Sequence, residues 1–335
     1  MAATGNTVLT LADWAKRLDP MGKVPTIVEL LSQTNEILDD MLWKEGNLPT
    51  GELVTIRTGL PTVYWRLLNA GVPPSKSQTA QITEQTGMLE AWSAVDKDLA
   101  IMNGDIGAFR MSEATAFLEA MNQEMASTLI YGNAGTSPSE FNGLAVRYSS
   151  LSAGNAQNII NAAGTQDSPS DLTSIWCVAW GEQTVHGIFP KGSKAGLIHD
   201  DFGEETIEVT SGIAGNVMRG LRERYQWKAG LVVKDWRYVV RIANIDLSDV
   251  AAETTTASII NHMQNALTRL PNRLGRPAFY MNRNSAAQLD RLARLNVGAG
   301  GGITYENFDG RVIRKFQGAP IRIVDAILST ETAVS

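Results

Sequence analysis

The amino-acid sequence predicts an α+β fold with more than one lobe, in which helices and strands follow one another without a regular order. Two long stretches carry apolar residues at helical spacing, and many shorter stretches alternate apolar and polar residues as strands do. The 335 residues exceed the ~250–300 at which a single core usually stops growing. With 44% hydrophobic and 19% charged residues, the chain can build a sizeable core, which excludes a disordered protein.

The composition also excludes several kinds of protein and site. No stretch approaches the ~18 uninterrupted apolar residues of a membrane-spanning helix. The N-terminus has neither a basic leader nor an apolar run, so we expect no secretory signal and an intracellular product. The single cysteine, Cys177, excludes an intrachain disulfide and a cysteine-cluster metal site, and it suits a reducing cytosol. His186, His199 and His262 are too scattered to suggest a zinc site.

Charge is distributed unevenly along the chain, whose formal net charge is −6. Residues 1–170 hold 10 Lys and Arg against 18 Asp and Glu, whereas residues 171–335 hold 19 against 17. The acidic molecule has no electrostatic footprint for gripping nucleic acid. Its arginine runs are interpreted as solvated faces, or as patches that meet complementary patches on another copy of the chain. The runs comprise Arg222 and Arg224, followed by Arg269, Arg273, Arg276, Arg283, Arg291 and Arg294.

The first 50 residues predict an arm followed by one helix. Residues 1–23 show little hydrophobic periodicity, which indicates an extended segment with a short helical piece at 11–17. Thr26 and Glu29 then form a T-x-x-E capping box, and apolar residues follow at helical spacing as far as Leu42. We expect this helix to end near residues 44–46.

Residues 53–95 predict strands on either side of a break. The stretch LVTIRT alternates, Tyr64 and Trp65 are good strand residues, and Gly71–Pro74 interrupts the chain. The following stretch SQTAQITEQT is polar at nearly every position, so neither of its faces can be buried in the chain's own core. We therefore expect a long hairpin that projects from the body and needs a neighbouring molecule.

A second helix is predicted over Ser112–Ile130. Ser112 is a plausible N-cap, and Glu113 complements the helix dipole in the first turn. Apolar residues recur along one face, while polar residues face away. The apolar stripe consists of Phe117, Leu118, Met121, Met125 and Leu129, and both methionines are interpreted as core residues.

Short elements are expected in the middle of the chain. Residues 133–170 are rich in Gly, Ser, Asn and Pro and contain one strand-like piece, EFNGLAVRY. The stretch SIWCVAW predicts a buried strand. Residues 225–233 and 236–245 both alternate, which predicts a hairpin about Lys234 and Asp235.

The last third predicts two helices and three strands. Helical spacing is found over 256–270 and over 285–295, and Ser285 is expected to cap the second helix. PAFYMN predicts a strand. The closing stretch RVIRKFQGAPIRIVDAIL predicts two short strands about Gly318–Pro320.

A search for catalytic and cofactor motifs finds none. The chain lacks the phosphate-binding G-x-x-x-x-G-K-[ST] loop, the G-x-S-x-G elbow of serine hydrolases and the H-E-x-x-H zinc motif. The run Gly298–Gly302 follows a helix rather than a strand, so it is interpreted as a surface loop and not as a dinucleotide loop. We accordingly predict no catalytic, cofactor-binding or metal-binding residue and no enzymatic activity.

Three weaker candidates are interpreted as structural. The acidic stretch HDDFGEETIE does not have the spacing of a calcium loop, which leaves a solvated loop or a partner for the arginine runs. His199 could act as a base oriented by Asp200, but no nucleophile is marked. Cys177 lies among apolar neighbours, as a small buried hydrophobe does.

The order of these parts resembles the HK97-like fold of the major capsid proteins of tailed bacteriophages, above all those of short-tailed podoviruses of the epsilon15 kind. The order is an arm, a projecting two-stranded loop, a long helix, an irregular α+β lobe and closing short strands. The likeness covers nearly the whole chain. It is carried by the hairpin from Glu52 to Asp98, the helix Met111–Tyr131, the segment WKAGLVVKDWRYVVRIANID and the closing KFQGAPIRIVDAI.

The resemblance implies a division of the chain and a function. Residues 1–50 are expected to form the N-terminal arm, 51–100 the extended loop, 101–135 with 306–335 the peripheral domain, and 136–305 the axial domain. Pentamers and hexamers are expected to build an icosahedral head around double-stranded DNA, assembled in the host cytoplasm and present in the virion. Expected partners are further copies of the chain and scaffolding, portal and decoration proteins. Some relatives link subunits covalently between a lysine and an asparagine, but nothing pairs Lys76 near the loop tip, so we expect non-covalent joints.

Three alternatives remain open at this point. An encapsulin-type nanocompartment has the same shell fold and encloses a cargo enzyme in place of DNA. A soluble two-lobed enzyme predicts a compact monomer or small oligomer, with a radius of gyration near ~20 Å. A phage tail or decoration component is expected to be richer in strands and to lack the long helix.

Overall fold

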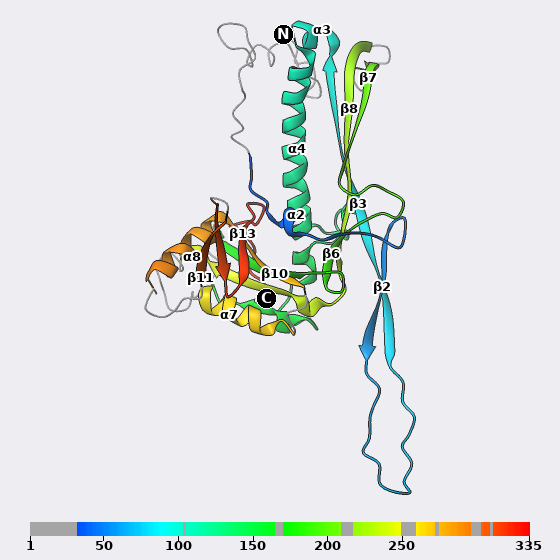
Figure 1. Ribbon diagram of the computed structural model, residues 1–335, viewed down its shortest axis with the longest axis vertical. Coiled ribbons are helices and arrows are strands. Elements are labelled where there is room, and N and C mark those ends of the chain that lie inside the picture. Colours follow the sequence, from blue (N-terminus) through cyan, green and yellow to red (C-terminus); the bar gives the residue numbers. More distant parts are fainter. Residues whose placement is uncertain are drawn as a thin grey trace. The chain divides into compact units, whose positions relative to one another are not determined.

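The computed structural model in Figure 1 describes residues 32–102, 105–164, 170–208, 217–248, 259–271, 275–295, 303–308 and 311–335. The arm predicted at 1–23, the capping box at Thr26 and Glu29, and the glycine run 298–302 lie outside the described residues. Helices and strands are both present, in agreement with the predicted α+β class. In the described part of the chain, no helix combines the length and the apolar composition that crossing a membrane requires.

The chain forms two compact units. Of the described residues, the first unit comprises 32–33 and those within Met88–Met125 and Gly196–Lys228. The second unit comprises Thr34–Gly87, Ala126–Ala195 and Ala229–Ser335.

The centre of the second unit is a sheet built around β5 (Leu172–Trp180), in which every residue is buried. This strand confirms the prediction from SIWCVAW. It pairs antiparallel with β10 (Arg276–Met281) on one side and with β9 (Val239–Asp246) on the other. Shorter strands extend the sheet on both sides: β4 (Ile159–Asn161) beside β9, then β13 (Ala319–Ile323), β12 (Arg311–Phe316) and β11 (Ile303–Phe308) beyond β10.

Two helices pack on one face of this sheet (Figure 1). They are α7 (Ile259–Arg269) and α8 (Arg283–Leu295), which confirm the two helices predicted from the periodicity. Their buried side chains contact alternate residues of the strands, such as Cys177 and Phe279, because alternate residues of a strand share a face. The predicted cap Ser285 is wrong, since Asn282 Oδ1 accepts a hydrogen bond from the Ser285 backbone N–H at 2.8 Å.

The helix predicted from Thr26 to about Gly46 is wrong over its described part. Only α2 (Ile37–Asp40) is helical, and β1 (Trp43–Glu45) follows it and pairs in parallel with β6 (Val185–Phe189). The Glu36 backbone N–H donates to Ile323 O at 3.3 Å, and the Ile323 N–H donates to Glu36 Oε2 at 3.1 Å. Pairing with the C-terminal strand therefore replaces the local helix, as tertiary context overrides propensity.

The predicted hairpin is confirmed in the second unit. β2 (Gly51–Gly59) pairs antiparallel with the first part of β3 (Gln78–Asp96), from Gly51 opposite Gln85 to Gly59 opposite Gln78 (Figure 1). The strand character expected for Tyr64 and Trp65 is wrong, because residues 60–77 contain no strand. Prolines at 61, 73 and 74 remove backbone donors on both sides of the tip, which prevents a continuous ladder there.

The second predicted hairpin is wrong in its pairing although its strands exist. β8 (Val217–Val233) ends where expected, but its last residues pair with β6, whereas β9 pairs with β5 and β4. Between them, the Lys234 N–H donates to Thr184 O, and Asp235 accepts from Arg237 N–H at the start of the 3-10 helix η2 (Trp236–Tyr238). The chain therefore crosses over instead of turning back on itself.

The strand expected from EFNGLAVRY is also wrong. Its centre forms the short helix α5 (Leu144–Arg147), and another short turn, η1 (Ala156–Asn158), leads into β4. Gly143 is extended and precedes the first helical residue, so the glycine separates the two conformations.

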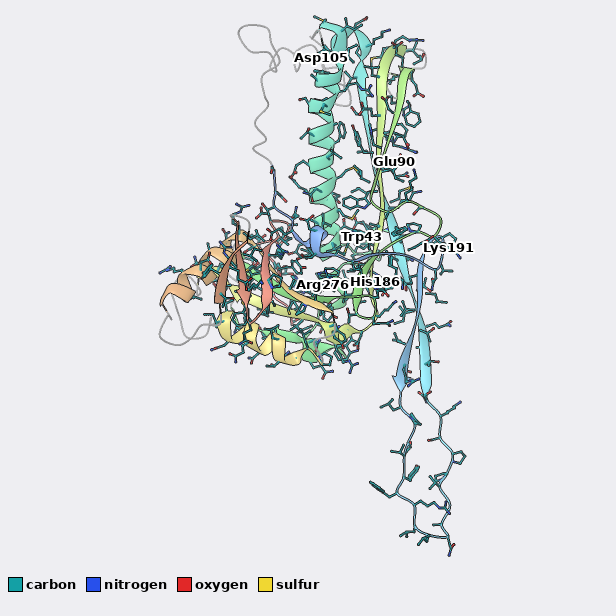
Figure 2. All side chains as sticks on the ribbon, viewed as in Figure 1. Trp43, Glu90, Asp105, His186, Lys191 and Arg276 are labelled. Atoms are coloured by element: carbon teal, nitrogen blue, oxygen red, sulfur yellow. The ribbon has the colours of Figure 1, made fainter. Side chains whose placement is uncertain are left out.

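The first unit consists of the rest of β3, α3 (Lys97–Met102), most of α4 (Ile106–Tyr131), β7 (Leu197–Glu208) and most of β8. β7 pairs antiparallel with β8 along its whole length. Val95, Ala100 and Phe109 form a small buried core with Leu221 beside it. The long helix is confirmed, but it begins at Ile106 because Asp105 Oδ1 accepts the Ala108 N–H at 3.0 Å, so Ser112 is not its cap (Figure 2).

Candidate interaction surfaces

The tip of the hairpin, residues 60–77, exposes large apolar side chains. Leu60 and Val63 have exposed fractions of 81% and 86%, and Trp65 and Leu68 are fully exposed. Trp65 is the largest of these side chains, and burying such a ring in a partner stabilises a contact strongly. Exposed apolar side chains gathered in this way mark an interaction surface rather than a solvated loop.

The hairpin also carries a charge of one sign. Glu52 and Glu84 mark its root, and between them the sequence contains no Asp or Glu but three cations, Arg57, Arg66 and Lys76. The whole chain has a net charge of −6, so the hairpin differs in sign from the molecule to which it belongs. Its charge therefore complements an acidic partner surface.

The root of the hairpin is held by buried charged groups. Arg147 forms a two-pronged ion pair with Glu84, with Nη1–Oε1 and Nη2–Oε2 distances of 2.5 and 2.7 Å. Glu52 accepts from His186 Nε2 at 3.1 Å and lies 3.3 Å from Lys234 Nζ. These five residues, Glu52, Glu84, Arg147, His186 and Lys234, are called the root cluster here; His186 lies beside Trp43 on the neighbouring strand (Figure 2).

In the first unit, four of the exposed apolar side chains lie on α3 and the start of α4. Ile101, Met102, Ile106 and Met111 are exposed, and Met111 has an exposed fraction of 73%. Asp98 and Asp105 are exposed among them. This surface is therefore apolar and acidic.

The acidic stretch HDDFGEETIE forms strand β7 rather than a loop, and it is a partner for arginines, as one of the two predictions stated. Asp200 pairs with Arg224 at 2.5 Å and Glu205 with Arg222 at 3.5 Å, across the two strands. Aromatic rings lie beside these ion pairs. The Trp92 and Phe202 rings stack with their centres 5.5 Å apart, and the Arg222 guanidinium lies 4.2 Å from the centre of the Trp92 ring. These arginines are thus occupied within one chain.

The remaining candidates from the sequence do not form a catalytic group. His199 Nε2 lies 3.2 Å from Glu223 Oε2, whereas Asp200, its expected orienter, pairs with Arg224 instead. Cys177 is fully buried in β5, and burial raises the pKa of its thiol to about 12. Within the described residues, no group of three or more His, Cys, Asp or Glu side chains could hold a metal ion.

Comparison with known proteins identifies the family. A family described as major capsid protein GP7 matches residues 19–335. The chain belongs to this family of major capsid proteins. A chain of the bacteriophage epsilon15 structure is 32% identical, with a TM-score of 0.79, and the match covers 100% of this chain and 99% of that chain. No curated protein sequence matches this chain.

Other solved phage-like shells are more distant. The capsid of a native GTA particle is 10% identical with a TM-score of 0.46, over 68% of this chain and 95% of that chain. The capsid of bacteriophage JBD30 is 10% identical with a TM-score of 0.42, over 78% and 83%. The family and the full-length likeness to epsilon15 show that this major capsid protein has the HK97-like fold and forms the multimeric shell of a phage capsid.

Sequence reasoning did not find the root cluster of this capsid protein. Its members are far apart in the sequence: four belong to β2, β3, α5 and β6, and Lys234 directly follows β8. One sequence feature pointed to it: residues 53–83 contain no Asp or Glu, and Glu52 and Glu84 lie at the two ends of this stretch. Their partners Arg147 and Lys234 carried no signal, because a single charged residue in a sequence is usually solvated.

Proposed function

We propose that this capsid protein forms the icosahedral head of a tailed phage from pentamers and hexamers, without enzymatic activity, around double-stranded DNA. Assembly takes place in the host cytoplasm, through non-covalent joints, with scaffolding, portal and decoration proteins as further partners. A net charge of −6 supports a DNA container, because a strongly basic lining would retain the packaged duplex through many phosphate contacts.

The proposal divides the chain by its role in the shell. Residues 1–50 serve as the N-terminal arm, 51–100 as the extended loop, 101–135 with 306–335 as the peripheral domain, and 136–305 as the axial domain. The extended loop lies over a neighbouring subunit. Each contact is weak, but every subunit is held by several neighbours at once, so the closed shell is strong.

One observation carries this proposal, namely the exposed apolar tip of the hairpin. Trp65, Leu67 and Leu68 contact little of their own subunit, and their exposure costs the isolated chain solubility without stabilising its fold. Covering the tip with a second copy removes that apolar area from water. The cations Arg57, Arg66 and Lys76 then meet an acidic neighbour.

The experiment removes the tip and keeps the hairpin. Because Gly59 lies opposite Gln78, residues 60–77 can be replaced by Asn-Gly, the sequence preferred in a two-residue hairpin turn. We expect this variant to fold with an unchanged circular dichroism spectrum but to form no shells by gel filtration and negative-stain electron microscopy. The matched control Trp65→Phe keeps an aromatic ring at the tip and should form shells.

Either of two results would overturn the proposal. Normal shells from the Asn-Gly variant would show that the tip is not a subunit contact. Shells of the unchanged chain that copurify with a cargo enzyme instead of DNA, when isolated from infected cells, would exclude the DNA container.

A further inference from the structure

Two carboxylates face each other across the ladder at the root of the hairpin. Glu52 and Glu84 are direct partners in the β2–β3 register, and both are buried, with exposed fractions of 7% and 6%. Like charges directly opposite each other in a sheet destabilise it. Gly51 adds to the close approach of the strands here, since a Cβ at this residue would lie 1.9 Å from Glu84 O. Such an arrangement persists only if other groups compensate the two charges.

The root cluster supplies that compensation from three other parts of the second unit. Arg147 on α5 holds both oxygens of Glu84 and also donates from Nη2 to Asn142 O and Leu231 O, each at 3.2 Å. Lys234, after β8, lies beside Glu52 and donates to Glu182 O at 3.1 Å. Because burial lowers the pKa of His186, its ring adds no charge near neutral pH, and the two carboxylates face two cations, Arg147 and Lys234.

Beside this cluster, the hairpin contacts the body through two hydrogen bonds between Asn47 and Leu53, at 2.7 and 2.8 Å, through the pairing of β3 with β8, and through a small apolar contact. Val54 is buried against Ile188 and Val232, and Ile56 packs beside them. From Arg57 through Thr79 nearly every residue is exposed. The direction in which the hairpin leaves the body is therefore fixed within the few residues between Gly51 and Ile56.

We propose that the root cluster is the positioning element of the hairpin, in which Arg147 fixes the direction of β2 and β3 and so presents the tip to a neighbouring subunit. The proposal rests on the proposed function for its role in assembly. Charged hydrogen bonds of this kind are directional, and a guanidinium that holds both carboxylate oxygens fixes an angle as well as a distance. The apolar contact of Val54 adds area but no comparable direction.

The test measures the hairpin in unassembled subunits, so it does not depend on pentamers or hexamers. Hydrogen exchange is followed by mass spectrometry in peptides covering 51–57, 78–85 and, as a core reference, 172–180. We expect Arg147→Met to increase exchange in the two hairpin peptides by about tenfold or more without changing the β5 peptide, as in a local opening. Arg57→Met, in the exposed part of the same hairpin, is the matched control and should change none of them.

Two further variants keep the test decisive if Arg147→Met fails to fold. The double variant Glu84→Gln with Arg147→Met leaves no unpaired charge, so it should fold while its hairpin exchanges faster and its shells fail to close. Arg147→Lys keeps the charge but not the two-pronged geometry, and we expect an intermediate exchange rate.

Two results would overturn the proposal. Native hairpin protection in the double variant would show that other contacts position the hairpin without Arg147. An equal increase of exchange in the β5 peptide would show that Arg147 stabilises the whole unit rather than the hairpin. Fast exchange in the hairpin together with normal shells would contradict only the proposed role of the tip in assembly.

Discussion

Arg241 and Glu331 form an ion pair that is almost entirely buried in the second unit. The Arg241 Nη2–Glu331 Oε2 distance is 2.9 Å, and their side chains have exposed fractions of 5% and 6%. Tyr131 and Ser174 hydroxyls also donate to Glu331, and Arg241 Nη1 donates to Tyr148 O at 2.8 Å. The pair thus joins the C-terminal segment to β5, β9 and the end of α4.

Glu331→Gln should destabilise the folded subunit strongly. The variant leaves the Arg241 charge buried without its carboxylate, which costs about 3–5 kcal/mol in comparable buried pairs. The free energy of unfolding from urea titration measures the loss. Glu182→Gln, an exposed carboxylate, is the control and should change stability by less than about 0.5 kcal/mol. A loss for Glu331→Gln no larger than that of the control would contradict the role assigned to the pair.

His186 should make the subunit less stable in mild acid. Burial, opposed by the hydrogen bond to Glu52, lowers the pKa of His186 below its ordinary 6.5. The unfolded chain then binds the proton more readily than the folded one, so this stability is complete above pH 6.5 and is lost as the pH falls toward the folded pKa.

The measurement is the free energy of unfolding at about pH 7.5 and about pH 5.5, for the unchanged chain and for His186→Gln. Glutamine retains a donor toward Glu52 but cannot titrate. We expect the difference between the two pH values to be smaller in the variant. An identical difference in both proteins would show that His186 does not contribute.

At the scale of single residues, the sequence predicted which side chains are buried but not which side chains form ion pairs with one another. Apolar neighbours in the sequence placed Cys177 in the core correctly. The same reasoning could not connect Glu84 with Arg147 or Arg241 with Glu331, because each pair joins residues 63 or more positions apart. Such pairs are decided by the fold, and no local pattern encodes them.

Among the elements, α4 shows how a cap sets a boundary. The apolar stripe predicted the helix, but Ser112 lies inside it, and Asp105 supplies the capping oxygen. A stripe locates the middle of a helix better than its ends, since end residues differ only in one side-chain hydrogen bond.

Asp105→Ala should weaken the start of α4, whereas Ser112→Ala should not. Loss of an N-cap oxygen costs about 1 kcal/mol, while alanine in a helix interior is favourable. Urea unfolding of both variants, followed by circular dichroism, makes the comparison. A larger loss for Ser112→Ala than for Asp105→Ala would contradict the boundary seen here.

Strand positions were predicted more successfully than strand pairings. Alternation located β2, β5, β8, β9, β10, β12 and β13, because each alternates or is wholly apolar within a short window. The order in which strands pair depends on distant segments, so β8 and β9 were wrongly joined in one hairpin. Likewise, local periodicity assigned residues 32–36 to a helix. Their actual partner, the end of β13, lies 287 positions later in the sequence, so no local pattern could reveal it.

At the scale of the whole molecule, several arginines of the described residues pair with acidic side chains of the same chain. The arginines of β8 pair with the acids of β7, and Arg322 pairs with Asp40 at 3.0 Å. Pairing within the chain therefore accounts for Arg222 and Arg224 without a complementary patch on another copy. Copies with a net charge of −6 repel one another instead.

Shell assembly should not weaken as salt is added, because salt screens the repulsion between the acidic subunits as well as the smaller attraction of the three exposed hairpin cations for an acidic neighbour, and leaves the apolar contact of the tip in place. Raising NaCl from about 0.05 to about 0.5 M screens the repulsion between subunits, since the Debye length falls to a few ångströms. We expect light scattering from assembling subunits to rise equally fast or faster at high salt. Assembly that slows markedly would indicate that ion pairs between subunits dominate, with Lys76→Gln and Arg66→Gln as the first variants to examine.

Burial of the single thiol, Cys177, has a practical consequence for the intact particle. In the folded subunit its sulfur is buried and protonated, so maleimide reagents should not react with it. A cysteine introduced at any exposed position would then be the one site that takes up a fluorophore, without a background substitution. Reaction of Cys177 itself would in turn report the opening of the core, which makes the chain its own probe of particle integrity.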